Sequence, residues 1–141
     1  MRRYGWQRAP HSGGTAIPDS VQFDTQRRIL AYASKRYAGR FLRIEVRFRG
    51  HFCYIDAFCE PAAPTPSQLR ARRETRQAYL ERARSTPLHL CRLRYFRGLD
   101  RWSVAFYTYS HEKYEPSFFT SGEDLGTPEE GFEVGAIYLQ P

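Results

Sequence analysis

Arginine and tyrosine recur at alternating positions along two stretches of the chain, 41–60 and 88–109. Side chains two residues apart in a β-strand point to the same face of a sheet, so this spacing gathers both residue types on one surface. Guanidinium groups bind phosphate oxygens, and bases stack on aromatic rings for about 1–3 kcal/mol each. The sequence therefore predicts a platform for single-stranded nucleic acid. Its members are Arg43, Arg47, Tyr54, Arg92, Arg94, Tyr107 and Tyr109.

Two other interpretations of this surface stay open. Glu45 and Asp56 lie in the first stretch and neutralise part of its charge, and tyrosine is an ordinary strand residue. Aromatic residues and arginine are also enriched at protein interfaces, so the same face could form a homodimer or bind a protein partner. Composition alone does not separate a nucleic-acid platform from a protein-interaction module.

Histidine and cysteine occur twice in a His-X-Cys arrangement, at His51-Phe52-Cys53 and His89-Leu90-Cys91. On regular strands both members of each pair point the same way, so two neighbouring strands could supply four zinc ligands. The same face is the predicted hydrophobic core, where buried cysteines are common. We therefore expect no metal site, and no motif for a nucleotide or other cofactor occurs in the chain.

A third cluster, His111, Glu112, Lys113, Tyr114 and Glu115, carries groups suited to acid–base chemistry. Small toxin-like ribonucleases use such groups on a sheet without a metal. A loop of this composition is more often only a connection, so a metal-free ribonuclease ranks third, after nucleic-acid binding and protein interaction. We expect no catalytic residue.

Charge is distributed unevenly along the 141 residues. The chain has 22 Lys plus Arg against 15 Asp plus Glu, a net charge of +7, and only two of the cations are lysines. Residues 102–141 hold one cation, Lys113, against seven acids. The acidic segment 123–133 therefore either folds back over the basic face or lies away from it and leaves that face positive. Helix residues Arg73 and Arg76 are added to the predicted phosphate contacts.

The first alternating stretch predicts a β-hairpin with one aliphatic face. If Arg49-Gly50 is the loop, the residue numbers in each cross-strand pair add up to 99. The opposed pairs are then Val46 with Cys53, Arg43 with Asp56, Glu45 with Tyr54 and Arg47 with Phe52. Arginine is a poor first residue for the tight hairpin turns, and a loop using a left-handed Gly50 would shift this pairing.

The second stretch predicts a better specified hairpin, because Gly98-Leu99 has the order that a type II′ turn requires. The residue numbers in each cross-strand pair then add up to 197. The apolar pairs are Tyr95 with Trp102, Leu93 with Val104 and Cys91 with Phe106, and the polar pairs are Arg94 with Ser103 and Arg92 with Ala105. Pro116 excludes a central strand after this hairpin, so we expect an edge strand at 117–120.

Three helices complete the predicted domain, at about 20–38, 66–85 and 128–136. The second and third begin with capping boxes, Thr65-Pro66-Ser67-Gln68 and Thr127-Pro128-Glu129-Glu130. The helix at 66–85 has few apolar residues and should either dock shallowly or be partly disordered. Ile137-Tyr138-Leu139 is expected to pair as a last strand.

These patterns predict one α+β domain over 17–141, with an antiparallel sheet of about five strands covered on one face by two or three helices. Residues 1–16 lack periodicity and are expected to form a disordered basic tail. No apolar run reaches the roughly 20 residues needed to cross a bilayer, and three cysteines do not form a disulfide framework. The expected protein is cytoplasmic, makes no membrane contact, and binds single-stranded RNA or DNA non-catalytically.

Overall fold

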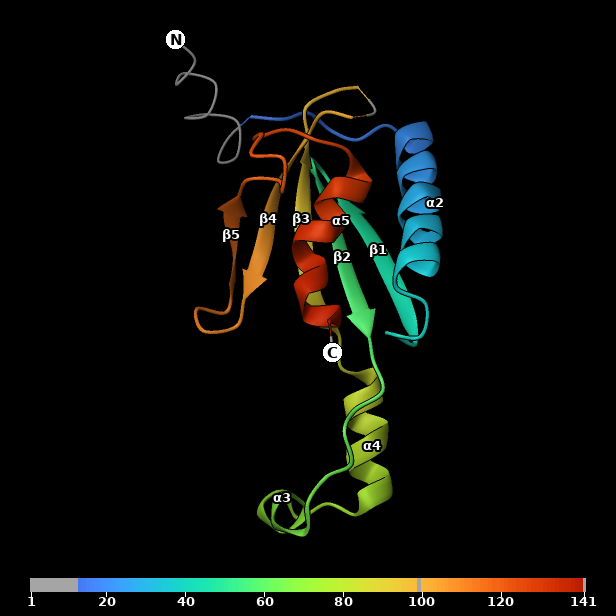
Figure 1. Ribbon diagram of the computed structural model, residues 1–141, viewed down its shortest axis with the longest axis vertical. Coiled ribbons are helices and arrows are strands. Elements are labelled where there is room, and N and C mark those ends of the chain that lie inside the picture. The colour runs from blue at the N-terminus through green and yellow to red at the C-terminus, as the bar shows by residue number, and fades with distance from the viewer. Residues whose placement is uncertain (1–12, 99, 141) are drawn as a thin grey trace.

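The computed structural model describes residues 13–98 and 100–140, so most of the predicted basic tail at 1–16 lies outside the described residues. Its centre is an antiparallel five-stranded sheet in which each strand lies beside the next along the chain (Figure 1). The strands are β1 (Arg43–Arg49), β2 (Phe52–Phe58), β3 (Leu88–Tyr95), β4 (Trp102–Thr108) and β5 (Lys113–Ser117). The predicted α+β fold with an antiparallel sheet is confirmed. None of the helices described is long and apolar enough to cross a membrane.

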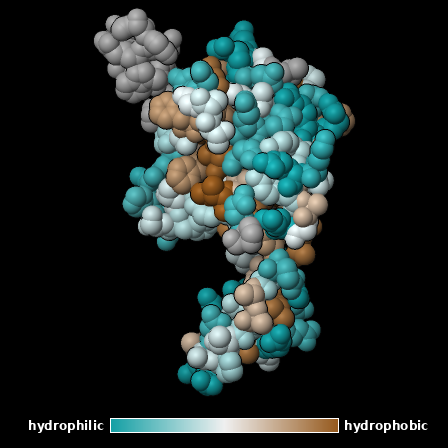
Figure 2. All heavy atoms as spheres, viewed as in Figure 1, coloured by the Kyte–Doolittle hydropathy of each residue, from teal (hydrophilic) through white to brown (hydrophobic). Residues whose placement is uncertain are grey.

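Two helices cover one face of this sheet, α2 (Asp19–Arg36) and α5 (Pro128–Gly135) (Figure 1). Ile29 and Ala33 of α2 and Phe132 of α5 are fully buried against it. The surface on this side is largely hydrophilic, apart from an apolar patch beside α5 (Figure 2). Both helices match the predicted ranges to within two residues. The side chains that they bury pack against the same face of the sheet.

The capping box at the start of α5 is confirmed. The hydroxyl of Thr127 accepts a hydrogen bond from the Glu130 N–H at 3.0 Å, and the Glu130 carboxylate accepts one from the Thr127 N–H at 2.9 Å. The predicted strand at 137–139 is wrong, because α5 continues into a 3₁₀ helix, η1 (Ala136–Leu139). Ala136 and Leu139 are both buried, and a spacing of three residues puts them on one side of a 3₁₀ turn.

The register predicted for the β1–β2 hairpin is wrong by two residues. Gly50 and His51 form its loop, and Arg49 pairs with Phe52. Gly50 has a φ of 59°, a left-handed conformation that glycine adopts without strain, and this moves the turn one position further along the chain. A shift of two leaves every side chain on its predicted face.

The consequence of this register is that Glu45 lies opposite Asp56, and Arg47 opposite Tyr54. The direct cross-strand pairing predicted between Arg43 and Asp56 does not exist. Asp56 is instead reached diagonally, by Nη2 of Arg47 at 3.0 Å.

The register predicted for the β3–β4 hairpin is confirmed. Arg92 pairs with Ala105 and Arg94 with Ser103, and Tyr95 pairs with Trp102 on the core side. The predicted type II′ turn depends on Leu99, which lies outside the described residues. The prediction of this register came from placing the centre of the hairpin at Gly98-Leu99, because alternation alone assigns faces and does not exclude a shift of two residues.

A β-bulge interrupts the pairing of β2 with β3. Ile55 pairs with Cys91 and Asp56 with His89, so Leu90 is the extra residue. Leu90 and Cys91 are both fully buried. The bulge therefore turns His89 to the face opposite Cys91, and the expectation that these two side chains share a face is wrong.

The edge strand β5 begins four residues before the predicted one. Pro116 lies within it, opposite Ala105 of β4. A proline has no N–H for a second neighbour, and β5 has a partner on one side only, so its place at the sheet edge accommodates the proline.

The segment predicted as one helix at 66–85 is two helices, α3 (Pro66–Arg72) and α4 (Arg76–Ser85). Arg73 ends α3 in a left-handed conformation, with a φ of 54°. The two helices form an arm that projects beyond the end of the sheet (Figure 1). Neither helix contains a buried residue, so the expectation that this segment docks on the sheet, even shallowly, is wrong.

Candidate nucleic-acid interface

The face of the sheet opposite α2 and α5 is called the open face here. Strand alternation and side-chain contacts place on it Arg43, Glu45, Arg47, Arg49, Phe52, Tyr54, Asp56, His89, Arg92, Arg94, Tyr107 and Tyr114. Of the residues predicted from spacing, all but Tyr109 are brought together directly on this face, and Tyr109 adjoins it. The two helices that cover the sheet, α2 and α5, lie on its other face, and on the open face the carbonyl of Gly13 accepts a hydrogen bond from Nη1 of Arg94 at 3.0 Å.

Arginine side chains on the open face lie over aromatic rings. The guanidinium carbons of Arg92 and Arg94 are 4.4 and 4.7 Å from the centroid of the Phe52 ring. Arg47 lies 5.1 Å from the ring of Tyr54 in the same way. A cation–π contact uses the flat face of a guanidinium group and not the N–H groups at its edge, so it is compatible with the binding of an anion.

Tyrosine rings continue this arrangement across the sheet. Tyr54 of β2 contacts Tyr114 of β5 at 5.6 Å between centroids, and Tyr114 contacts Tyr107 of β4 at 5.0 Å. Both contacts are edge-to-face, a favourable geometry for aromatic pairs. Burial raises the pKa of Tyr114, so its phenol stays neutral at neutral pH. All three rings remain partly exposed.

Asp56 lies at the centre of the open face and is almost fully buried, with 2 % of its surface exposed. One carboxylate oxygen is 3.0 Å from Nη2 of Arg47, and the other is 2.8 Å from Nδ1 of His89. The negative charge of Asp56 is therefore directed toward groups within the face rather than toward solvent.

The part of the acidic segment that belongs to α5 lies on the other side of the sheet. Glu129 binds Arg28 of α2, and Glu133 accepts a hydrogen bond from the hydroxyl of Tyr37 at 2.7 Å. Of the two arrangements left open by the sequence, these contacts show the one in which Glu129 and Glu133 stay away from the open face. Their charges do not neutralise its arginines.

The remaining predicted contacts lie away from the centre of this face. Tyr109 follows β4, contacts the ring of Tyr107 at 4.7 Å, and its hydroxyl accepts a hydrogen bond from the His89 N–H at 2.7 Å. Arg73 and Arg76 belong to the arm, one at the end of α3 and the other at the start of α4 (Figure 1). The structure does not bring these two arginines to the sheet.

Sequence reasoning missed four members of the site. Arg49 was assigned to the hairpin loop. Alternation placed Phe52 on the polar face, but the residue was not predicted to bind because its side chain is apolar. Tyr114 was assigned to a loop because the edge strand was predicted too late in the chain. His89 was assigned to the core because a β-bulge cannot be recognised from the alternation of apolar and polar residues.

The other clusters considered from the sequence are divided by the fold. His111 pairs with Glu115, with Nδ1 at 2.6 Å from the carboxylate, and this hydrogen bond holds the pKa of Glu115 below its usual value. Tyr114 points to the open face, so it does not join them. Within the described ranges, no group of three or more His, Cys, Asp or Glu side chains is arranged to hold a metal ion.

The two His-X-Cys pairs do not converge. His51 lies in the β1–β2 loop and His89 on the open face, whereas Cys53 and Cys91 are buried in the core. Burial raises the pKa of both thiols well above its usual value, so they remain protonated. Neither thiol is suited to bind a metal or act as a nucleophile.

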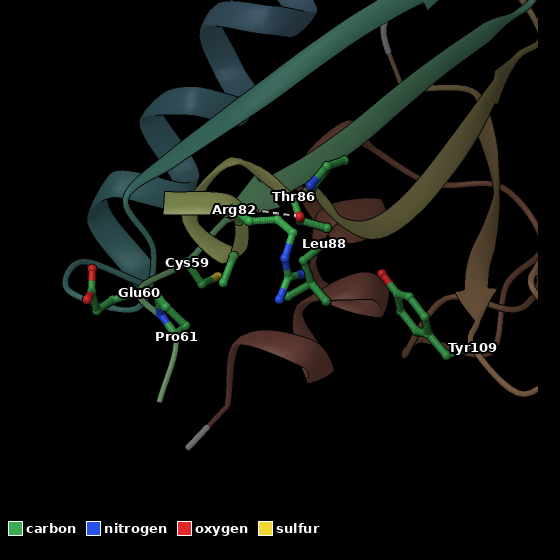
Figure 3. A pocket seen from close by; sticks show the side chains of 9 residues that line it. Cys59, Glu60, Pro61, Arg82, Thr86, Leu88 and Tyr109 are labelled. Carbon is green, nitrogen blue, oxygen red and sulfur yellow. Dashed lines mark hydrogen bonds between the residues drawn. The ribbon is translucent and has the colours of Figure 1, made fainter. Parts of the chain in front are cut away.

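A hollow of about 370 Å³ lies where the arm joins the sheet. Figure 3 shows Cys59, Arg82, Leu88 and Tyr109 around it, with the carbonyl of Arg82 accepting a hydrogen bond from Thr86. The walls of the hollow are mainly apolar, and Tyr109 lies at one end of it. The residues that line it do not form a cluster of reactive groups.

Comparisons with known proteins yield no match to a family model, a curated protein or a solved structure. The functional argument therefore depends on the geometry of the open face.

Proposed function

We propose that this protein binds single-stranded nucleic acid on the open face, with arginines on the phosphates and aromatic rings against the bases. The observation that carries this proposal is the pair of guanidinium groups, Arg92 and Arg94, held over the single ring of Phe52. Positive charge and aromatic surface therefore occur together on two neighbouring strands, β2 and β3. This is the combination that single-stranded nucleic acid requires.

The charge of the open face supports an anionic ligand. Arg43, Arg47, Arg49, Arg92 and Arg94 are accompanied by only Glu45 and Asp56 as acids, and Asp56 is buried. The acids Glu129 and Glu133 are bound on the helix side. A phosphate backbone would therefore meet a positive surface along the middle of the sheet.

The arm extends this proposal beyond the sheet. It carries six arginines against two glutamates, and Arg82 is paired with Glu74 at 2.9 Å. Arg73 and Arg76 lie at the bend between α3 and α4. We place them as outlying phosphate contacts for a strand that runs past the end of the sheet. The free cysteines Cys53, Cys59 and Cys91 suit a reducing, cytoplasmic location for this role.

The test is a titration of a fluorescent single-stranded RNA, followed by anisotropy at several salt concentrations. Binding should weaken steeply with salt, with a slope of about −0.7 for each phosphate contact. The double variant Arg92→Glu/Arg94→Glu should lose measurable binding. The control Arg27→Glu/Lys35→Glu makes the same change in net charge on exposed residues of α2 and should retain more affinity.

Two outcomes would reject the proposal. One is no binding of RNA or DNA at low salt by the folded protein, and the other is equal loss of affinity in both double variants. The protein-interaction alternative predicts instead a stable dimer in light scattering, dissociated by Arg92→Glu/Arg94→Glu.

A further inference from the structure

His89 is brought to the open face by a departure from regular strand geometry. The bulge at Leu90 reverses the direction of His89 relative to simple alternation, and two hydrogen bonds between the Tyr109 hydroxyl and the His89 backbone, at 2.7 and 3.4 Å, hold the position. Bulges often re-aim a side chain beside an active site. Here the bulge sets an imidazole among phosphate-binding arginines.

The imidazole is oriented by a buried carboxylate. Asp56 lies 2.8 Å from Nδ1 of His89, and its side chain is 3 % exposed whereas that of His89 is 31 % exposed. A carboxylate at Nδ1 favours the tautomer with the proton on that nitrogen, which leaves Nε2 to accept a proton. The arrangement is that of a base held in position by an acid behind it.

The neighbours of His89 supply the rest of a phosphodiester site. Its ring lies 4.9 Å from that of Tyr107 and 6.3 Å from that of Tyr114. Arg92 lies over Tyr114 at 5.4 Å, and Arg47 shares Asp56 with the imidazole. A base bound against these rings would put its ribose and phosphate near both the imidazole and a guanidinium group.

We infer that the open face also cleaves single-stranded RNA without a metal, with His89 as the general base, Asp56 as its positioning residue, and Arg92 stabilising the phosphate charge. The inference rests on the proposed RNA binding and adds a reaction to it. The same face then has two separable properties, retention of the strand and scission of its backbone.

The reaction uses the ribose 2′-hydroxyl of the RNA itself. Nε2 of His89 takes the proton of that hydroxyl, and the 2′-oxygen forms a bond to phosphorus. The bond from phosphorus to the 5′-oxygen of the next nucleotide breaks, and water gives that oxygen a proton. The resulting hydroxide takes the proton from His89, so the products are a 2′,3′-cyclic phosphate and a 5′-hydroxyl. Arg92 donates hydrogen bonds to the phosphate oxygens as their charge increases.

The other described pair of this kind, His111 with Glu115, fits the reaction less well. Glu115 follows Tyr114 in β5 and therefore points to the opposite face of the sheet. His111 has 64 % of its side chain exposed, and Glu115 31 %. His111 lies in the turn before β5, and the pair serves as the matched control.

The experiment incubates the purified protein with end-labelled single-stranded RNA in EDTA and follows both cleavage and binding. We expect fragments ending in 2′,3′-cyclic phosphate, and an intact strand when every 2′-hydroxyl is methylated. His89→Gln keeps a polar side chain but has no proton-accepting nitrogen, so cleavage should fall about 100-fold or more. Its affinity for the methylated strand should change by less than about threefold. His111→Gln should cleave as the unchanged protein does.

Two further measurements separate catalysis from folding. Added imidazole should restore part of the cleavage by His89→Ala, which no structural role of the side chain predicts. Asp56→Asn should lower kcat with little change in KM, because it disturbs the orientation of His89 and not the grip on the strand.

Each remaining outcome decides the inference. RNA that is bound but stays intact overturns the cleavage and leaves the proposed binding standing. Cleavage that persists unchanged in His89→Gln also overturns it. RNA that is neither bound nor cut rejects both the binding and the cleavage.

Discussion

Arg28 of α2 and Glu129 of α5 form a two-pronged ion pair, with Nε and Nη2 of Arg28 at 2.9 and 2.7 Å from the two oxygens of Glu129. The two residues are 101 positions apart in sequence. The pair fastens the start of α5 to the middle of α2 on the helix side of the sheet. It thereby keeps part of the acidic segment away from the arginines of the open face.

Glu129→Gln should lower the free energy of unfolding at neutral pH by about 1–2 kcal/mol, because a charge-assisted bidentate pair becomes a weaker one. Burial is the largest single influence and would raise the pKa of Glu129, but the hydrogen bond and charge of Arg28, together with hydrogen bonds from the Glu129 backbone and Thr127, outweigh it and hold the pKa below its usual value. A lowered pKa contributes stability above the unfolded-state value of about 4.3, and this stability is lost as pH falls through the folded-state value.

Urea unfolding at several pH values checks this expectation. The difference between the unchanged protein and Glu129→Gln should shrink as the pH falls below about 4. An equal difference at neutral and strongly acidic pH would mean that the carboxylate charge contributes nothing. Asp24→Asn, which alters an exposed pair within α2, is the matched control and should change stability by less than about 1 kcal/mol.

At Gly135, α5 lies directly against the backbone of β3. A Cβ placed there would lie 2.7 Å from the backbone carbonyl carbon and oxygen of Leu90. At Gly131, one turn earlier, the added carbon would clash instead with a methyl group of Leu93, the end of a flexible side chain. Gly135→Ala should therefore destabilise the protein by about 1–3 kcal/mol, and Gly131→Ala by less. Urea unfolding of both variants checks the order, and a larger loss at Gly131 would contradict it.

The sequence predicted best those features that depend on local chemistry. The capping boxes at Thr65 and Thr127 are formed as predicted, since each needs only residues three positions apart. The β3–β4 pairing was correct because its centre was placed at the local turn signal Gly98-Leu99, and alternation then assigned the two faces. The single helix at 66–85 failed at Arg73, where a left-handed residue ends α3 without a glycine.

The candidate site was predicted in its faces and not in its details. Alternation gave the correct face for Arg43, Arg47 and Tyr54 even with the wrong register, because the error was an even number of residues. The position of His89 depends on a bulge, and the position of Tyr114 depends on where a turn ends. Both positions depend on tertiary structure, and the alternation of residues along a strand does not predict them.

The arm should be dispensable for folding. Neither α3 nor α4 buries a residue, and Ala57 pairs directly with Leu88 across the point where the arm leaves the sheet. Replacing residues 61–86 with a short Gly-Ser linker should leave the melting temperature within a few degrees of the original, as about 1 kcal/mol would change it by 2–8 °C. Calorimetry measures this. A melting temperature lowered by much more would show that the arm supports the core.

The same deletion tests the place of Arg73 and Arg76 in binding. If these residues bind outlying phosphates, the arm-deleted protein should bind a long RNA more weakly and with a shallower salt slope, by about 0.7 for each phosphate that is no longer bound. A strand short enough to lie within the sheet should bind with nearly unchanged affinity. Equal affinity for both lengths would confine the interface to the open face.

Tyr37 should titrate later than an ordinary tyrosine. Burial, followed by its hydrogen bond to Glu133, raises the pKa of Tyr37 to about 12. A raised pKa contributes stability below the unfolded-state value of about 10, and this is lost as pH rises toward 12. Tyr37→Phe should therefore weaken the dependence of stability on pH between these values. Absorbance of the phenolate gives the titration, and an unaltered curve in Tyr37→Phe would contradict the assignment.

Phe52 should contribute to binding through its ring rather than its bulk. Phe52→Leu keeps an apolar side chain but removes the surface on which Arg92 and Arg94 lie and on which a base could stack. Stacking is worth about 1–3 kcal/mol, so affinity for single-stranded RNA should fall by about 5-fold to 100-fold. The salt slope should change little, because no phosphate contact is removed, whereas Arg92→Glu should reduce it. Phe23→Leu on α2, where the ring is 72 % exposed on the helix side, is the control and should bind normally. Equal affinities of the two leucine variants would show that the aromatic surface of the open face takes no part in binding.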